Sequence, residues 1–284
     1  MQRLWPNLRG IAPSKRHFLL EMAGEADLAR TLVGLRAWSS EAVAAAYGGW
    51  YASGPFDVGG TTRQALQPAA SARSDKAKAA RAAASRESQA NGALMRCAPI
   101  GIWGRDAKEA AAAAREDALL SHPHSVCQSA SAAFVAAIST AIGGGDREAM
   151  LAATYAAIPE PQASAVRDRL DLAKRGEGPG DFMHEQGWVL TAFQNAFRHL
   201  ASGAPIEDAL IATVGEGGDT DTNGAICGAL LGAAQGSTAI PVRWNMAVLA
   251  CRPLAEVGAL QPRPPRYWPD DVAVLAEALV RRGS

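Results

Sequence analysis

The sequence GEGGDTDTNGAICGALLGAAQG, residues 215–236, joins a glycine-rich turn with two aspartates to a stretch that has glycine at every fourth position. Gly224, Gly228, Gly232 and Gly236 therefore share one face of a predicted helix. A glycine inside a helix costs about 1 kcal/mol relative to alanine, so four of them need a structural reason. We expect this bare face to let another backbone approach closely, within a central buried helix.

The rest of the chain also has helical character. Alanine- and leucine-rich stretches show a helical period, and several of them end in glycine and begin after Ser, Asp or Pro. We find no convincing alternating strand pattern, no repeat of fixed length and no long linker. The sequence therefore predicts an all-α fold, in one compact multi-helix domain over residues 1–284.

The composition excludes several classes of function. Lys plus Arg and Asp plus Glu are both 28, so no net field favours nucleic acid or an anionic membrane. The most basic stretch, residues 71–89, is better explained as a solvated helix or mobile loop than as a polyanion site. The four cysteines are far apart among apolar neighbours and are expected to be reduced. With neither a signal peptide nor a membrane span evident, we expect a cytoplasmic protein.

The turn before the glycine-faced helix offers more polar groups than a helix start needs. Asp219, Thr220, Asp221, Thr222 and Asn223 are all good N-cap residues, and one would suffice. Two neighbouring carboxylates repel each other, and burying them is costly unless a cation or a proton intervenes. Oxygen ligands of this kind suit a hard divalent ion, so metal binding is favoured over capping alone.

The same turn matches the first half of a calcium-binding EF-hand loop. The letters DTDTNG fit its first six positions, but the twelfth position, which should be a glutamate, is Leu230. The residues after the turn also continue an apolar helix instead of a loop. An EF-hand is therefore excluded.

Four stretches in the same order resemble motifs of the ADP-ribosylglycohydrolase family. GGDTDTNGAICGALLGA resembles its C-terminal metal motif, SGPFDVGGTT (53–62) its first loop, NGALMRCAPIGI (91–102) its GNG-x-x-MR loop, and SHPHSVC (121–127) its His-Pro segment. The tail RYWPDDVAVLAEALV is similar to a common ending. The resemblance runs from about residue 28 to the C-terminus.

The resemblance implies an all-α fold with a two-Mg²⁺ centre in a cleft. Such enzymes cleave the glycosidic bond that joins ADP-ribose to an acceptor, often an arginine side chain. A metal can hold the ribose hydroxyls and orient or activate the attacking water. The implied partners are ADP-ribose or an ADP-ribosylated protein, and the implied state is a monomer. No membrane or general nucleic-acid binding is expected.

The resemblance also assigns residues. Asp219 and Asp221 match the catalytic and metal-binding aspartates, and Thr222 a further metal ligand. The matched substrate-binding positions are Gly60 and Thr61 in the first loop, Asn91, Gly92, Ala93 and Met95 in the loop that cradles the diphosphate, and His122 near the ribose.

Three further residues have alternative readings. Arg96 suits either the diphosphate or a structural salt bridge. A lone histidine such as His122 is otherwise more often a capping or core residue. Trp188 lies where the family often has an aromatic residue near the adenosine, although a core tryptophan is favoured.

The N-terminal part of the metal motif departs from the family. Its Thr-Asp-Asp triplet falls on Leu19, Leu20 and Glu21, of which only Glu21 is acidic, and residues 1–20 are divergent. Glu21 is the expected replacement ligand, with Glu25 and Asp27 as alternatives. Three hypotheses follow: an active glycohydrolase with a rearranged site, an impaired homologue that binds ADP-ribose without hydrolysis, or a structural, crystallin-like use of the scaffold.

Overall fold

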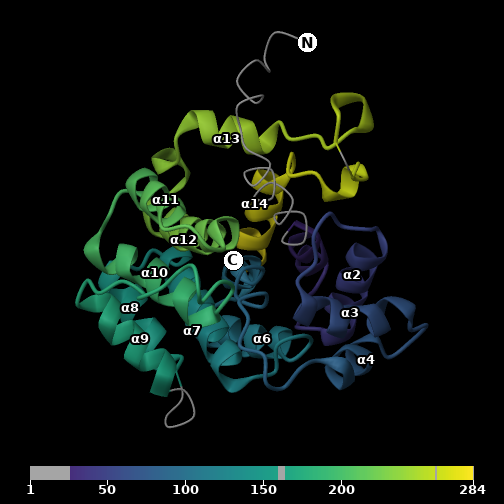
Figure 1. Ribbon diagram of the computed structural model, residues 1–284, viewed down its shortest axis with the longest axis horizontal. Helices are drawn as coiled ribbons and strands as arrows, with labels where there is room; N and C mark the ends of the chain where they lie inside the picture. Colours follow the sequence, from purple (N-terminus) through teal and green to yellow (C-terminus); the bar gives the residue numbers. More distant parts are fainter. Residues whose placement is uncertain (1–25, 159–163, 260, 284) are drawn as a thin grey trace.

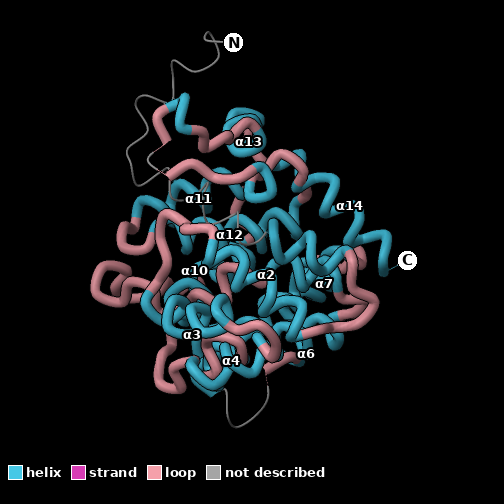
Figure 2. The backbone as a smooth tube through the Cα atoms, turned by 90° about the vertical axis from the view of Figure 1, so that its right-hand side faces the viewer, coloured by secondary structure: helices cyan, strands magenta, loops and turns pink. Residues whose placement is uncertain are grey.

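The computed structural model describes residues 26–158, 164–259 and 261–283. Across these residues the chain is helical without a named strand, and its one antiparallel bridge joins Ala90 to Trp188 (Figure 2). The all-α prediction is confirmed. Glu21 and Glu25 lie outside the described residues.

The described chain begins with a helical segment at residues 26–33. The helices that follow are α2 (Ser40–Ala52), α3 (Gly60–Ser71), α4 (Lys76–Ala83), α5 (Ala98–Trp103), α6 (Ala107–Ala118), α7 (Ser125–Ile142), α8 (Arg147–Ala156), α9 (Ser164–Lys174), α10 (Val189–Ser202), α11 (Ile206–Gly215), α12 (Thr220–Gln235), α13 (Val242–Leu249) and α14 (Val272–Gly283). Short 3-10 turns lie at Ser237–Ala239, Ala255–Val257 and Pro265–Tyr267.

Helix α7 lies at the centre of the arrangement. It packs against α5, α6, α8 and α12, with α2–α4 on one side of the molecule and α8–α12 on the other (Figure 1). Among the described helices, α7 is long and apolar enough to cross a membrane by length and composition alone. Of this helix, 72% is buried inside the protein, which is the pattern of a core helix.

The beginning and the end of the described chain are held together by charged contacts. Arg30 pairs with Asp271 and donates to the carbonyl oxygens of Arg266 and Trp268, while Arg266 pairs with the fully buried Asp27. Asp27, one of the alternative replacement ligands, thus has one carboxylate oxygen in an ion pair with an arginine. The other oxygen, Oδ2, is buried without a hydrogen-bond partner.

Among the described residues, no other backbone approaches Gly224, Gly228 or Gly232 on α12, so the expected close approach is not found there. A Cβ on Gly224 or Gly228 would meet only the side chains of Val214 and Leu210 on α11, at 3.9 and 3.5 Å. A Cβ on Gly232 would meet nothing within 4 Å. The face is open because α11 supplies ordinary side-chain contacts to one part of it and nothing covers the rest within the described chain.

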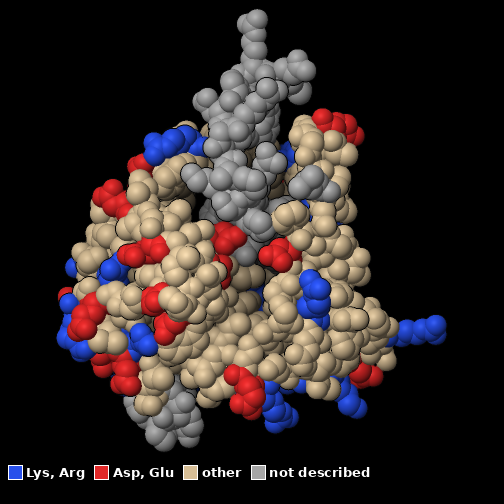
Figure 3. Space-filling view, in the orientation of Figure 1, with Lys and Arg blue, Asp and Glu red and all other residues tan. Residues whose placement is uncertain are grey.

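The basic stretch 71–89 forms the short helix α4 and its flanks. Lys76 Nζ donates to the carbonyl oxygen of Ala69 at 2.8 Å, near the end of α3, and Arg81 pairs with Glu116 on α6. On the face drawn in Figure 3, basic and acidic side chains alternate without a large patch of one sign. Two of the basic residues thus serve local structure.

Three of the four cysteines are buried, and all four are free thiols. Burial raises the pKa of Cys127 to about 12 and that of Cys227 to about 11. These thiols are therefore protonated and unreactive at neutral pH, as expected for core cysteines.

Candidate active site

The turn that carries the two aspartates begins α12. Asp219 is its N-cap residue, yet the Asp219 side chain makes no capping hydrogen bond. Asp219 Oδ2 instead accepts from Asn91 Nδ2 at 2.7 Å, across 128 positions of sequence. Asp221 Oδ1 accepts from the backbone N–H of Thr222 at 3.1 Å. Capping therefore does not explain the carboxylate of Asp219.

Two glycines place this turn against the segment before α10. Gly217 and Gly218 have φ of +78° and +68°, and a Cβ on Gly218 would lie 2.0 Å from the carbonyl oxygen of Phe182. Only glycine fits this conformation at such a close approach. The Gly218 N–H also donates to the sulfur of Met183 at 3.1 Å. The two glycines thus fix the direction in which Asp219 enters the site.

The two aspartates share an unfavourable electrostatic environment. The pKa of Asp221 is raised, first by burial and then by a hydrogen bond to Asp219 and by the charge of Asp219. A group with this shift holds a proton longer than an exposed aspartate, unless a cation replaces that proton.

The donor set suits Mg²⁺, which binds through one or two carboxylates and keeps several waters. Asp219 and Asp221 would hold the ion, together with the hydroxyl of Thr222. Within the described residues there is no cluster of three or more His, Cys, Asp or Glu side chains around them. A second ion would need a further carboxylate, and Glu21 lies outside the part of the chain that the structure describes.

The loop of residues 91–96, called the 91–96 loop below, runs beside this turn. Backbone hydrogen bonds hold the start of this loop and the residues just before it. Asn91 N donates to Gly187 O at 2.8 Å, and Val189 N donates to Gln89 O at 2.9 Å. A Cβ on Gly92 would lie 2.8 Å from His122 Cε1 and 3.0 Å from Thr62 Oγ1, so no side chain fits there. The loop thus brings the bare backbone of Gly92 between two polar side chains.

His122 lies beneath this loop and is only 1% exposed. Its Nδ1 is 2.8 Å from the hydroxyl oxygen of Ser121. Burial, with a smaller contribution from the charge of Arg96, lowers the pKa of His122 to about 3. The imidazole is therefore neutral at physiological pH. One of its ring nitrogens can donate a hydrogen bond and the other can accept one.

Arg96 belongs to a buried ion pair. Its Nε donates to Asp117 Oδ2 at 3.0 Å and its Nη2 to Asp117 O at 3.1 Å, and Tyr47 donates to the other carboxylate oxygen at 2.7 Å. The guanidinium carbon lies 4.6 Å from the centre of the Tyr47 ring. Of the two readings of Arg96, the geometry fits the structural salt bridge.

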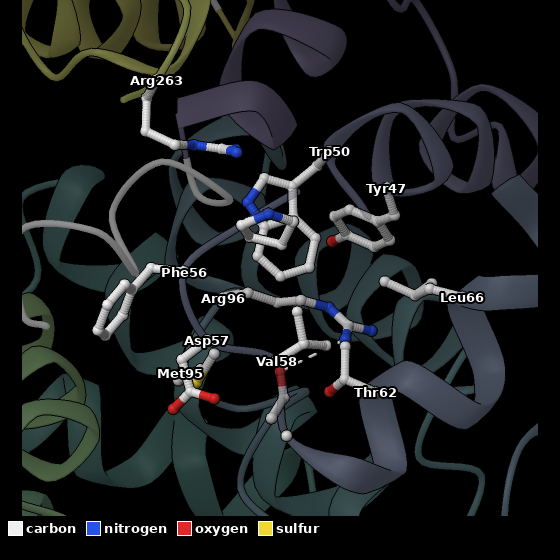
Figure 4. Close-up of a pocket in the computed structure, with 13 residues that line it drawn as sticks. Tyr47, Trp50, Phe56, Asp57, Val58, Thr62, Leu66, Met95, Arg96 and Arg263 are labelled. Carbon is white, nitrogen blue, oxygen red and sulfur yellow. Dashed lines mark hydrogen bonds between the residues drawn. The ribbon is translucent and has the colours of Figure 1, made fainter. Parts of the chain in front are cut away.

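A cavity of about 90 Å³ opens between α2, α3, the 91–96 loop and the C-terminal segment (Figure 4). Its lining residues come from the first loop and its flanks, from the 91–96 loop and from the C-terminal segment: Tyr47, Trp50, Pro55, Phe56, Asp57, Val58, Gly59, Thr62, Leu66, Gly92, Met95, Arg96 and Arg263. Gly92 lines the cavity, and its neighbour Asn91 donates a hydrogen bond to Asp219 in the aspartate turn.

The remaining expected site residues surround this region. Met95 lines the cavity, whereas Ala93 is fully buried in the core. Gly60 is exposed at the start of α3, and Thr61 Oγ1 lies 2.8 Å from Ser88 Oγ. Gly60 and Thr61 lie beside the cavity wall formed by Gly59 and Thr62.

Trp188 takes a structural position. Its Nε1 donates to Gln89 Oε1 at 3.1 Å, the Arg169 guanidinium lies 4.8 Å from its ring centre, and the ring packs on the core. These contacts fit the core reading that the sequence favours.

Comparison with known proteins then decides the family. A family model described as ADP-ribosylglycohydrolase matches residues 17–282. The chain belongs to the ADP-ribosylglycohydrolase family. One similar solved structure, described as an "ADP-ribosylglycohydrolase-related protein complex", aligns with a TM-score of 0.69 and 26% identity, over 93% of this chain and 81% of that chain. A comparison with curated protein sequences finds no significant match.

Membership supports a glycohydrolase-type hydrolase that acts on ADP-ribosylated substrates. The sequence reasoning missed four residues around this ADP-ribosylglycohydrolase site: Tyr47, Trp50, Asp117 and Arg263. Tyr47 and Trp50 lie in an alanine-rich helix and Arg263 in a proline-rich tail, so no local pattern distinguishes them. Only the tertiary fold brings them to the 91–96 loop.

Proposed function

We propose that this chain is a magnesium-dependent hydrolase that releases ADP-ribose from a modified protein side chain, with arginine as the first acceptor to test. The observation that carries the proposal is the hydrogen bond between Asn91 and Asp219. It joins the glycine-rich loop to the aspartate turn, and so places a backbone able to face phosphate beside a carboxylate pair able to hold a cation.

Each residue then has a defined task. Asp219, Asp221 and Thr222 would hold Mg²⁺, which when bound supplies positive charge to orient a water and the ribose hydroxyls. Asn91 donates a hydrogen bond to Asp219 Oδ2 and so fixes the position of this oxygen. The backbone of the turn then sets the direction in which Asp219 Oδ1 points. The bare backbone of Gly92 lets a ligand approach closely, and the neutral His122 beside it offers a hydrogen bond to a hydroxyl group.

An impaired homologue is the second candidate. It is favoured by one observation, that the described residues place two carboxylates and no third at this turn. Such a protein would bind ADP-ribose without turnover. A structural, crystallin-like protein would bind neither ADP-ribose nor metal.

The test is release of ADP-ribose from an arginine-ADP-ribosylated protein, followed by chromatography with Mg²⁺ and with EDTA. Parallel assays with serine-linked substrate and with an ADP-ribose ester would define the acceptor. Release that requires Mg²⁺ and is lost in Asp221→Asn supports the hydrolase. Saturable ADP-ribose binding without release on any substrate supports the impaired homologue, and absence of both binding and release supports the structural protein.

We further propose that the protein is cytoplasmic, because its cysteines are free thiols, and that it is a monomer, as the family resemblance implies. Light scattering of the purified protein would check the mass, for which one chain corresponds to 29.5 kDa.

A further inference from the structure

We propose that Met183 is a site of reversible oxidation, and that its conversion to methionine sulfoxide by a hydroperoxide displaces the aspartate turn (residues 217–221). The displacement itself does not depend on the proposed function. That function bears only on one consequence, which is weaker binding of Mg²⁺ by Asp219 and Asp221.

The sulfur of Met183 supports the start of the aspartate turn. Met183 Sδ accepts a hydrogen bond from the Gly218 N–H at 3.1 Å. A Cβ on Gly217 would lie 2.9 Å from the same sulfur, so the thioether fills the space where a side chain of Gly217 would begin. Both glycines have positive φ and directly precede Asp219. A change at this sulfur therefore acts on the backbone that sets the direction of the Asp219 side chain.

The turn has little room to absorb an added atom at this sulfur. A Cβ on Gly218 would lie 2.0 Å from Phe182 O, so the Gly218 backbone is already close to the residue before Met183. A Cβ on Gly187 would lie 3.8 Å from Asp219 Oδ2, so the end of the same segment reaches the carboxylate. The segment thus contacts the turn at several points, and a larger group at the sulfur shifts these contacts.

The backbone of Met183 is held on both sides. Asp181 Oδ1 accepts from Met183 N at 2.9 Å and from His184 N at 2.8 Å. Gln186 Nε2 donates to Met183 O at 2.9 Å. Because the main chain is fixed by these bonds, a change at the sulfur falls on its contact with the turn.

The sulfur is also accessible to a soluble oxidant. Met183 is 57% exposed, compared with 61% for Met246 on α13 and 1% for Met150 on α8. Among the described residues, Met183 has a hydrogen bond to its sulfur and Met246 has none. Met246 is therefore a matched control, with similar exposure but without this contact.

The reaction needs a two-electron oxidant of the hydroperoxide class. A lone pair of Met183 Sδ attacks one peroxide oxygen, an S–O bond forms and the O–O bond breaks. With hydrogen peroxide, the proton of the transferred hydroxyl group passes to the other oxygen, which leaves as water. The thioether is thus oxidised by two electrons and the peroxide is reduced. The sulfoxide is polar and chiral, and methionine sulfoxide reductases convert it back to the thioether.

The oxidised side chain changes the contact with Gly218 in either of its two epimers. If the oxygen takes the lone pair that faces Gly218, the N–H must donate to that oxygen and the sulfur lies one bond length farther away. If the oxygen takes the other lone pair, the sulfur loses electron density and accepts more weakly. A thioether sulfur is already a weak acceptor. Both epimers therefore alter the position of Gly218 relative to Met183.

The experiment treats the full chain with hydrogen peroxide and follows the assigned Gly218 amide signal in nitrogen–proton NMR spectra. Peptide mass mapping measures the sulfoxide at each methionine. We expect Met183 and Met246 to be oxidised well before Met150, and the Gly218 signal to shift in proportion to the sulfoxide at Met183. Methionine sulfoxide reductase should restore the signal. A thiol reductant alone should not, which separates this change from cysteine oxidation.

Two variants separate Met183 from the other residues that peroxide oxidises. In Met183→Leu the shift of Gly218 caused by peroxide should be lost, whereas in Met246→Leu it should persist. Three results would overturn the proposal. They are resistance of Met183 to peroxide, a Gly218 signal that stays in place while Met183 is converted to sulfoxide, and an equal shift in Met183→Leu.

Calorimetric titration of Mg²⁺ measures the consequence for the aspartates. Oxidised wild-type protein should bind Mg²⁺ about fivefold more weakly than the reduced protein, which is the effect of one lost hydrogen bond. Peroxide should leave the Mg²⁺ affinity of Met183→Leu unchanged. Absence of Mg²⁺ binding by the reduced protein would reject the proposed function and leave the shift of Gly218 standing. Equal Mg²⁺ affinity of the oxidised and reduced wild-type protein would overturn the effect on the aspartates.

Discussion

The 91–96 loop touches two pairs of ionisable groups, one at each end, and they are built in opposite ways. At its far end Arg96 and Asp117 are opposite charges, buried together and joined by hydrogen bonds to Tyr47 and to backbone. At its near end Asn91 meets Asp219, whose neighbour Asp221 carries the same charge. The opposite charges of Arg96 and Asp117 balance each other, and this pair holds the loop in place. The like charges of Asp219 and Asp221 are balanced only when a proton or a cation binds between them.

The largest effect should come from breaking the balanced pair. Asp117→Asn leaves the buried charge of Arg96 without its partner, and removing one member of such a pair costs about 3–5 kcal/mol. Chemical denaturation would measure this loss. The matched control is Asp270→Asn, which breaks the exposed pair with Arg252 and should cost below about 1 kcal/mol. Equal costs for the two variants would show that burial does not distinguish these pairs.

His122 should make stability fall as the solution is acidified. Its folded pKa of about 3 lies below its unfolded value of about 6.5, so the unfolded chain binds a proton first, and stability is lost as pH falls below 6.5. Between pH 7 and pH 5, the free energy of unfolding should fall by about 2 kcal/mol. His122→Gln should lose less stability over that range, as measured by denaturation at both pH values. An unchanged pH dependence would contradict the assignment of a buried neutral imidazole.

Removing the unbalanced pair should have a smaller effect on stability. Asp219→Asn combined with Asp221→Asn should leave the free energy of unfolding the same or raise it by up to about 1 kcal/mol at pH 7, because a partly buried repulsion is lost. The raised pKa of Asp221 means that its stabilising, protonated form is lost as pH rises, so the gain should disappear in acid. Circular dichroism should show unchanged helix content. An unfolded double variant would favour a structural role for the turn.

The smallest effect concerns the helix that follows this turn. Gly232→Ala should stabilise the protein by up to about 1 kcal/mol, because its Cβ meets nothing within 4 Å and alanine favours a helix. Gly218→Ala is the contrasting variant and should destabilise, since its Cβ would overlap Phe182 O. Thermal melting would compare them. A destabilised Gly232→Ala would show that an element outside the described residues covers this face.

Helical periodicity was sufficient to predict the fold class, because alanine-rich amphipathic stretches leave little room for strands. The aspartate turn was also visible, since two carboxylates in a glycine-rich turn exceed what capping needs. The glycine spacing does not predict the neighbours of α12, because a periodicity gives the face of a helix but not what lies against it. The roles of Asp117, Trp50 and Arg263 depend on contacts between residues distant in sequence, which no local pattern encodes.

The most direct test of the unbalanced carboxylate pair is calorimetric titration of Mg²⁺ into the metal-free protein, with and without ADP-ribose. We predict saturable Mg²⁺ binding that ADP-ribose strengthens and that Asp219→Asn with Asp221→Asn removes. Asp117→Asn, if folded, should retain it. Absence of Mg²⁺ binding by the folded wild-type protein, with or without ADP-ribose, would contradict the account and leave the aspartates without their proposed role.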